Sequence, residues 1–284
     1  MPIQKFDTEH MHRITFNSIA EFSDFIEADD HDKAMQRRKH TSLTYEAAMS
    51  VEKARECARL GCYWPEGAKN IEPIELDVDA LNASDLAIQL PVAAMQGYRA
   101  NVGAFLSGAP KCMVKTAPAV RPNRLLRIGV QVGKAWDVEQ HLTFNRGNAI
   151  LSVLNALHEL GFAIELWAVE RTYERTLTHC QSNEVCIKRA SDSYSPDSIA
   201  FALCNDAYQR RLCWRSSEIR GETNPHVQSI IDAAYGMGQD VDFSDFDISY
   251  GYLLNRRQWH NKAYALDHIV KDTKRQLDKM REGL

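Results

Sequence analysis

The chain has 284 residues, of which 44% are hydrophobic and 25% charged, and these ordinary globular values exclude a disordered chain. Its formal net charge of −4 argues against a protein whose whole surface is built to hold nucleic acid. Seven cysteines, an odd number in a long chain, exclude a small disulfide scaffold. No apolar run reaches the roughly 18 residues of a membrane span, and no apolar signal region follows Met1. We therefore expect a cytoplasmic protein without a membrane partner.

The first 120 residues predict a mainly helical region that packs on the rest of the chain. Ser18 and Glu21 have the spacing of a capping box, so a short helix is expected over 18–28. Apolar spacing predicts further helices over 44–60, where Thr44 is the cap, and over 79–90. An acidic run followed by a basic run over 29–40 indicates a solvated connector, with a phosphate-binding strip as the alternative.

Two prolines mark the internal boundary of the chain. Residues 116–123 contain Pro118 and Pro122, which fix the backbone and remove hydrogen-bond donors. We interpret this stretch as an extended linker. It divides an N-terminal region, 1–120, from an α/β core domain, 121–284.

The core domain opens on a β-α-β unit. An apolar strand over 125–132 is followed by a helix over 146–160, with Asn145 as its cap and Gly161 as its stop. A second apolar strand over 162–168 completes the unit, which implies a parallel pair of strands buried on both faces. Further elements are expected in chain order: a strand over 184–189, a helix from Ser195 and Pro196, a helix over 225–235, a strand over 246–250 and a helix over 259–280. The predicted fold class is α/β, a mostly parallel sheet flanked by helices with an N-terminal helical extension.

The turn after the first core strand lacks the motifs of a cofactor site. A single glycine, Gly133, is followed by Lys134 and Ala135, without Gly-x-Gly-x-x-Gly or Gly-Lys-Ser/Thr. A von Willebrand A-type metal site would need Asp-x-Ser-x-Ser at this point. The arrangement of elements resembles a Rossmann-like or von Willebrand A-like core with a degenerate metal site. We expect no cofactor and an interaction that needs no metal.

Candidate metal ligands are scattered along the chain. Asp137, Asp247 and His260 are the alternative ligand set of a metal-dependent enzyme acting on nucleic acid, although surface charge and helix capping explain them more simply. His179 and Cys180, with Cys186, form the nearest approach to a zinc cluster, but the paired spacing of a structural zinc site is missing. We interpret them as a surface histidine and small buried thiols.

Four residues are candidate binding residues. Arg210 and Arg211 precede Trp214, and guanidinium groups beside an indole can contact phosphates and stack on bases. The alternative interpretation places Trp214 in the core and pairs the arginines with Glu218. Arg146 at a helix start is disfavoured by the helix dipole unless an anionic group lies nearby, so it indicates a partner carboxylate or a ligand.

Several short stretches, in their order along the chain, carry a resemblance to a known family. They are WPEG at 64–67, FLSGAPKCM at 105–113, RGNA at 146–149, LNALHELG at 154–161 and YQRRL at 208–212. In these stretches the chain resembles an uncharacterised family of tailed-bacteriophage and prophage proteins, known mainly as a domain of unknown function. The resemblance implies a role in the infected host cell or on the virus particle, and it supplies no catalytic residues.

Without a catalytic signature, the sequence favours a non-enzymatic binding or assembly module. Its expected partner is a protein or a nucleoprotein, with nucleic acid as the alternative, and the oligomeric state is left open. Two other functions stay open as well. One is the metal-dependent enzyme with Asp137, Asp247 and His260, and the other is a structural component of the phage particle.

Overall fold

The computed structural model describes residues 4–28, 42, 47–81, 83, 89–118, 124–174, 176, 178–193, 195–233, 237–238, 245–254 and 256–282. The strands are β1 (Gln4–Asp7), β2 (Met11–Phe16), β3 (Gln89–Ala94), β4 (Arg99–Ala100), β5 (Met113–Pro118), β6 (Arg124–Gln131), β7 (Phe162–Tyr173), β8 (Cys180–Lys188), β9 (Met237–Gly238) and β10 (Ile248–Tyr250). The α-helices are α1 (Ile19–Glu27), α3 (Val51–Arg59), α4 (Pro65–Ala68), α5 (Val102–Leu106), α6 (Gln140–Glu159), α7 (Pro196–Ile199), α8 (Trp214–Gly221), α9 (Pro225–Asp232) and α10 (Lys262–Glu282). Short 3-10 helices form η1 (Val78–Leu81) and η4 (Arg257–Trp259), and π-helical turns form η2 (Ala200–Cys204) and η3 (Tyr208–Cys213).

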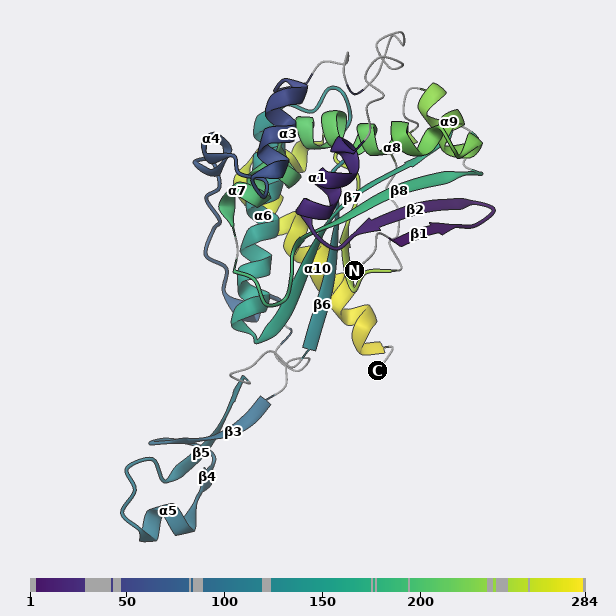
Figure 1. The fold of residues 1–284 in the computed structure, drawn as a ribbon. Helices are drawn as coiled ribbons and strands as arrows, with labels where there is room; N and C mark the ends of the chain where they lie inside the picture. Colours follow the sequence, from purple (N-terminus) through teal and green to yellow (C-terminus); the bar gives the residue numbers. More distant parts are fainter. Residues whose placement is uncertain are drawn as a thin grey trace.

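The centre of the molecule is a mixed sheet (Figure 1). In the described part of the chain it has seven strands in the order β1-β2-β8-β7-β6-β10, with β9 paired to β7. The pairs β2–β8, β6–β7 and β6–β10 are parallel, whereas β1–β2, β7–β8 and β7–β9 are antiparallel. The α/β class is confirmed.

The predicted β-α-β unit is present as β6, α6 and β7, with β6 and β7 parallel as expected. The expectation of a mostly parallel sheet holds only in part, because the other half contains antiparallel pairs as well. β8 follows β7 after a connection of six residues, which is too short for a parallel crossover and returns the chain antiparallel. The result is a mixed sheet, since β2 then pairs parallel with β8 and β1 pairs antiparallel with β2.

Within its described residues, the N-terminal region contains strands as well as helices. Its hairpin β1–β2 joins the main sheet through the parallel pairing of β2 with β8. The expected helix over 79–90 is corrected where its residues are described. Residues 79–81 belong to the 3-10 helix η1, and β3 begins at Gln89, because Pro91 removes a helical donor and biases its predecessor to extended backbone, while 82 and 84–88 lie outside the described residues. Residues 116–118 of the expected linker belong to β5, and 119–123 lie outside the described residues, as do the connector 29–40 and Thr44.

Several predicted helix ends are confirmed. Ser18 Oγ accepts a hydrogen bond from Glu21 N at 3.2 Å, and Ser195 caps α7 in the same way. Gly161 ends α6 with a φ of 90°, a conformation that glycine adopts without strain. The predicted start of α6 is wrong, because the helix begins at Gln140 and not at Arg146. The N-cap residue is Glu139, whose side chain makes no cap hydrogen bond.

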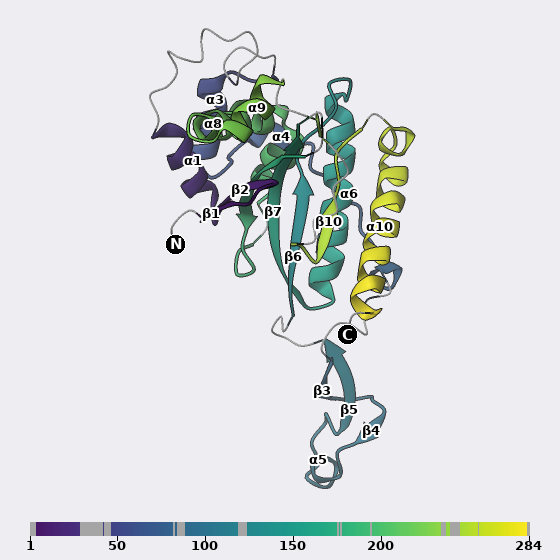
Figure 2. The same ribbon diagram turned by 90° about the vertical axis from the view of Figure 1, so that its right-hand side faces the viewer.

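The large hydrophobic core lies on one face of the sheet. Leu126 and Ile128 of β6 are paired with Ile164 and Leu166 of β7, and all four belong to one buried cluster that includes side chains of α1, α6 and α10. The opposite face carries a separate small cluster of Trp167, Val169, Cys186 and Phe246. Figure 2 shows α6 and α10 running along the sheet beside β6 and β10. In the described ranges, every helix is too short or too polar to cross a lipid bilayer.

A second, small unit stands apart from the main body (Figure 1, Figure 2). It consists of the three-stranded sheet β3-β5-β4 with α5, residues 89–118, and we call it the arm. β5 pairs antiparallel with both β3 and β4. The arm is joined to the body at the end where β6 begins.

Candidate functional site

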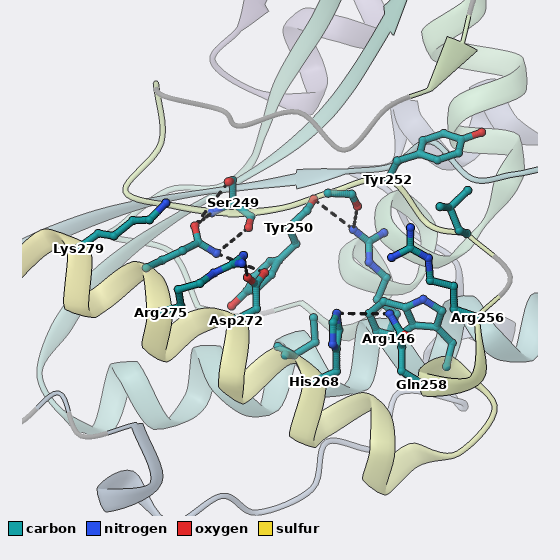
Figure 3. Close-up of a pocket in the computed structure, with 15 residues that line it drawn as sticks. Arg146, Ser249, Tyr250, Tyr252, Arg256, Gln258, His268, Asp272, Arg275 and Lys279 are labelled. Carbon is teal, nitrogen blue, oxygen red and sulfur yellow. Dashed lines mark hydrogen bonds and ion pairs between the residues drawn. The ribbon is translucent and has the colours of Figure 1, made fainter.

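A cavity of about 520 Å³ lies between β10 and α10, at the edge of the main sheet (Figure 3). β10 pairs with β6 on one side, and its other side faces α10. The lining residues are Arg146, Ser249, Tyr250, Gly251, Tyr252, Leu254, Arg256, Gln258, Trp259, His268, Ile269, Asp272, Arg275, Gln276 and Lys279. The cavity follows the carboxyl end of a parallel strand, the usual ligand position in α/β folds.

Arg146 forms the inner wall of this cavity. Its side chain is buried, and its guanidinium donates to the carbonyl oxygens of Gln131 at 2.9 Å, Tyr250 at 3.2 Å and Gly251 at 2.6 Å. Because α6 begins at Gln140, Arg146 lies in its second turn and not at the positive end of the helix dipole. These three backbone oxygens tie the ends of β6 and β10 together through Arg146.

The free side of β10 is closed by a glutamine of α10. Gln276 Oε1 accepts from Ser249 N at 2.7 Å, and Gln276 Nε2 donates to Ser249 O at 2.9 Å. Tyr250 Oη and Thr273 Oγ1 lie 2.9 Å apart, which fixes the same strand one residue later. The exposed backbone groups of an edge strand invite pairing with another chain, and this carboxamide occupies them.

The cavity is positively charged in a chain that is acidic overall. Four of its lining residues are cations, and Asp272, which pairs with Arg275, is its only carboxylate. The ring of His268 meets that of Trp259 edge-on, with the ring centroids 5.1 Å apart. Burial lowers the pKa of His268, so this residue adds little positive charge at neutral pH. The geometry favours an anionic guest over a cationic one.

The other three predicted binding residues lie elsewhere and line none of this cavity. Arg210 pairs with Asp206 at 3.0 Å, and Arg211 donates to the carbonyl oxygens of Ser42 at 2.6 Å and Met49 at 3.2 Å. Trp214 is buried against Val227 and Ile231. Burial lowers the pKa of Arg211. Glu218, the partner considered for the arginines, accepts hydrogen bonds from the backbone and hydroxyl of Ser42 and lies 3.7 Å from Nη1 of Arg215.

The alternative metal ligands are not brought together in the described part of the chain. Asp247 accepts a hydrogen bond from Arg127 N at 2.8 Å, Asp137 lies in the turn before α6, and the His260 ring lies 6.1 Å from that of His141. One group of three candidate ligands does occur among the described residues, and it consists of His12, His179 and His226. His179, interpreted from the sequence as a surface residue, is half-buried there.

The arm is a second candidate binding surface. Asn101 Oδ1 caps α5 by accepting from Ala104 N at 3.1 Å, and the Asn101 backbone N donates to Cys112 O at 2.8 Å. A Cβ on Gly97 would lie 2.1 Å from Val114 O, so the chain can pass β5 this closely only at a glycine. The arm is therefore a defined structure, yet none of its described side chains, residues 93–115, is buried.

Sequence reasoning missed both surfaces for identifiable reasons. The cavity is lined mainly from α10 and the stretch after β10, whose charged residues resemble an ordinary solvated helix face. Residues 105–113 did stand out, as one of the stretches that carry the family resemblance. Nothing in that pattern shows that its side chains lack a core to enter.

Comparisons with known proteins place the chain in one family. The model of the domain of unknown function DUF7192 matches residues 5–284. No curated protein and no solved structure matches the chain. The bacteriophage origin expected from the sequence stays a prediction. Because the match spans nearly the whole chain, the protein belongs to the DUF7192 family.

Proposed function

We propose that the protein is a binding or assembly module whose arm docks onto a protein partner. The observation that carries this proposal is that large apolar side chains of the arm are exposed to solvent. Phe105 is 67% exposed and Leu106 78%, and Met95, Tyr98 and Val102 are exposed as well. The main sheet and its helices, which we propose to be Rossmann-like or von Willebrand A-like, serve as the scaffold that presents them.

Physical chemistry favours burial of this surface against another molecule. A small sheet gains independent stability from a third strand with a hydrophobic face or from packing against a helix. The arm exposes five large apolar side chains close together in the chain, between Met95 and Leu106, which is unusual for a surface that stays in water. Large exposed apolar patches mark protein interaction sites, so a partner protein is the occupant that this chemistry fits.

Charge defines the partner further. The arm contains Arg99, Lys111 and Lys115 but no aspartate or glutamate, whereas the whole chain carries a formal charge of −4. The complementary surface is therefore apolar at its centre and acidic at its rim. The resemblance to tailed-bacteriophage and prophage proteins supports the infected host cell, or the particle itself, as the place where that partner is met.

Site-resolved cross-linking of the full chain, expressed in its source organism, tests this proposal. We expect an amine-reactive cross-linker to join Lys111 and Lys115 to lysines that lie beside acidic segments of one other protein. The double variant Phe105→Asp, Leu106→Asp should lose those links while the chain stays folded. Tyr264→Asp, which changes an equally exposed apolar residue on α10, is the matched control and should keep them.

Three outcomes would contradict the proposal. The first is that the arm lysines form links within their own chain alone. The second is that the double variant keeps every link that the control keeps. The third is that the arm cross-links to nucleic acid under ultraviolet light in place of protein, which would reassign the arm as a nucleic-acid contact. Capture of a protein without links to the arm does not count in favour.

A second candidate function is recognition of an anionic group by the cavity beside Arg146. It is favoured by the four cations and single carboxylate of the lining. Calorimetric titration with inorganic phosphate tests it, with Lys279→Glu as the cavity variant and Lys53→Glu, on the distant α3, as the control. Binding that is weakened in the first and unchanged in the second supports this function, and equal binding by both contradicts it.

A further inference from the structure

Three histidine side chains meet where β2 and β8 begin, at the side of the sheet away from the cavity. His12 lies in β2, His179 directly precedes β8, and His226 lies in α9. One ring nitrogen from each lies within 4.8 Å of the other two. The rings are close to parallel, with centroids 4.0 Å apart for His179 and His226 and 5.2 Å for His12 and His226.

Two nitrogens of this cluster are buried without a hydrogen-bond partner. They are Nε2 of His12, whose residue is 3% exposed, and Nδ1 of His179. A buried polar atom without a partner costs about 1–3 kcal/mol, so native proteins usually supply one. Two such atoms in one group of three imidazoles indicate a missing common partner. A cation satisfies several lone pairs at once, which a single hydrogen-bond donor does not.

The other ring nitrogen of His12, Nδ1, lies between two polar side chains. It is 3.1 Å from Asp7 Oδ1 and 3.1 Å from Asn224 Nδ2. The amide of Asn224 is fixed, because its Oδ1 caps α9 by accepting from the backbone N of His226 and Val227. Asn224 Nδ2 can therefore only donate, and it competes with the acceptor Asp7 for the same nitrogen of His12. The charge-assisted bond to the carboxylate is about twice as strong as a neutral one, so it selects the proton on Nδ1 and leaves the lone pair on Nε2. A carboxylate behind a ligating histidine is the usual arrangement in metal sites.

The backbone that carries these histidines is also held in place. Arg220 donates to His12 O at 2.7 Å and to Ser182 O at 3.3 Å, which joins β2 to β8. Cys180 N donates to His10 O at 2.8 Å beside His179. His226 is exposed and His179 half-buried, so both rings are free to rotate toward a common centre. A tetrahedral site with metal–nitrogen distances of about 2.0–2.1 Å needs ring nitrogens about 3.4 Å apart, a contraction within reach of such rotation.

We propose that His12, His179 and His226 bind one divalent cation of the zinc class, with Asp7 as the residue that orients His12. Neutral imidazoles suit zinc, copper, nickel and cobalt, and exclude magnesium and calcium, which prefer oxygen. Three histidines leave the fourth position of a tetrahedral site to water or to another ligand. The ion ties three segments together: the N-terminal hairpin, the turn before β8 and α9. The site is independent of the arm.

Titration of the full chain with metal tests this site. Chelator-treated protein is titrated with Zn²⁺ by calorimetry and with Co²⁺ by visible absorption. We expect one ion per chain and the intense d–d bands of four-coordinate Co²⁺. His226→Ala and His179→Ala remove ligands that are not fully buried, so both variants should fold and bind at least about tenfold more weakly. Asp7→Asn should weaken binding by about 10- to 100-fold, the usual effect of losing such a supporting carboxylate.

His141→Ala is the matched control, because His141 belongs to another close pair of histidines, with His260. Its affinity and Co²⁺ spectrum should equal those of the unchanged chain. The proposal is overturned if Co²⁺ gives only the weak bands of a six-coordinate ion. It is overturned equally if His226→Ala and His179→Ala bind as tightly as the control, which would show adventitious surface binding.

Discussion

The main body and the arm differ in which side chains they bury and which they expose. In the body, charged groups are buried with partners: Arg171 Nη2 lies 3.0 Å from Glu184 Oε1, and both side chains are almost inaccessible to water. In the arm, large apolar groups such as Phe105 and Leu106 are exposed instead. The described body therefore buries charged groups in pairs, whereas the described arm leaves large apolar side chains exposed. This difference is the observation that supports the proposed docking of the arm onto a partner.

Removal of one leucine from each region should give the largest contrast. Leu166 of β7 is fully buried in the core, and Leu106 of α5 is 78% exposed. We expect Leu166→Ala to lower the free energy of unfolding by about 2–5 kcal/mol, because it leaves a cavity. Leu106→Ala should change it by less than about 0.5 kcal/mol. Urea denaturation measures both, and similar losses would show that the arm belongs to the folded core.

Arg146 should be the most important single polar residue of the body. Arg146→Met keeps most of the volume but removes the donors to Gln131 O, Tyr250 O and Gly251 O. We expect a loss of about 2–4 kcal/mol, since buried carbonyls are left without donors. Arg146→Lys should recover part of it. A loss below about 1 kcal/mol in denaturant unfolding would mean that the guanidinium does not hold β6 and β10 together.

Glu170 should make the stability of the main body depend on pH. Burial raises the pKa of this carboxyl from 4.5 to about 7, and the hydrogen bond from Asn183 offsets that only in part. Between these two values the folded chain keeps the proton and the unfolded chain loses it, so stability present below pH 4.5 is lost as the pH rises to 7. The pKa difference corresponds to a loss on the order of 3 kcal/mol.

The variant Glu170→Gln isolates this contribution. The free energy of unfolding of the unchanged chain, minus that of the variant, should fall steadily from pH 4.5 to pH 7 and then stay level. Glu9→Gln, at an exposed position, controls for the removal of one charge. A difference that does not vary with pH would show that Glu170 titrates normally.

Two helix caps of the same kind should contribute differently to global stability, because one lies in the main body and the other in the arm. Ser18 caps α1, which packs in the core, and Asn101 caps α5 in the arm. We expect Ser18→Ala to cost about 1 kcal/mol of global stability. Asn101→Ala should leave global unfolding unchanged while speeding amide exchange within α5. Thermal and urea unfolding compare the two, and an equal cost would remove the distinction between the regions.

The sequence predicted the parts of the fold that depend on local patterns. Apolar spacing and the stop at Gly161 gave the β6-α6-β7 unit, and the spacing of Ser18 and Glu21 gave the cap of α1. The role of Arg146 was misjudged because α6 starts six residues earlier, where Glu139 makes no cap hydrogen bond that a pattern could reveal. The antiparallel return of β8 depends on pairing between strands, which no local pattern determines.

The candidate sites could not be predicted for a related reason. His12, His179 and His226 come from three segments far apart in the sequence. The pairing of β2 with β8 and the contact of Asn224, which caps α9, with His12 bring them together. The cavity likewise depends on the packing of α10 beside β10. For the arm, exposure of Phe105 and Leu106 is a property of the tertiary structure, because the same residues in a packed loop would be buried.

Hydrogen exchange of the arm amides tests the central claim most directly. The full chain is compared alone and in the complex isolated through an affinity tag from its source organism. We predict that amides of α5, Val102–Leu106, exchange quickly in the free chain and at least about tenfold more slowly in the complex, while those of β6 and β7 stay unchanged. Equal exchange of the arm in both states, with new protection confined to the body, would contradict the account.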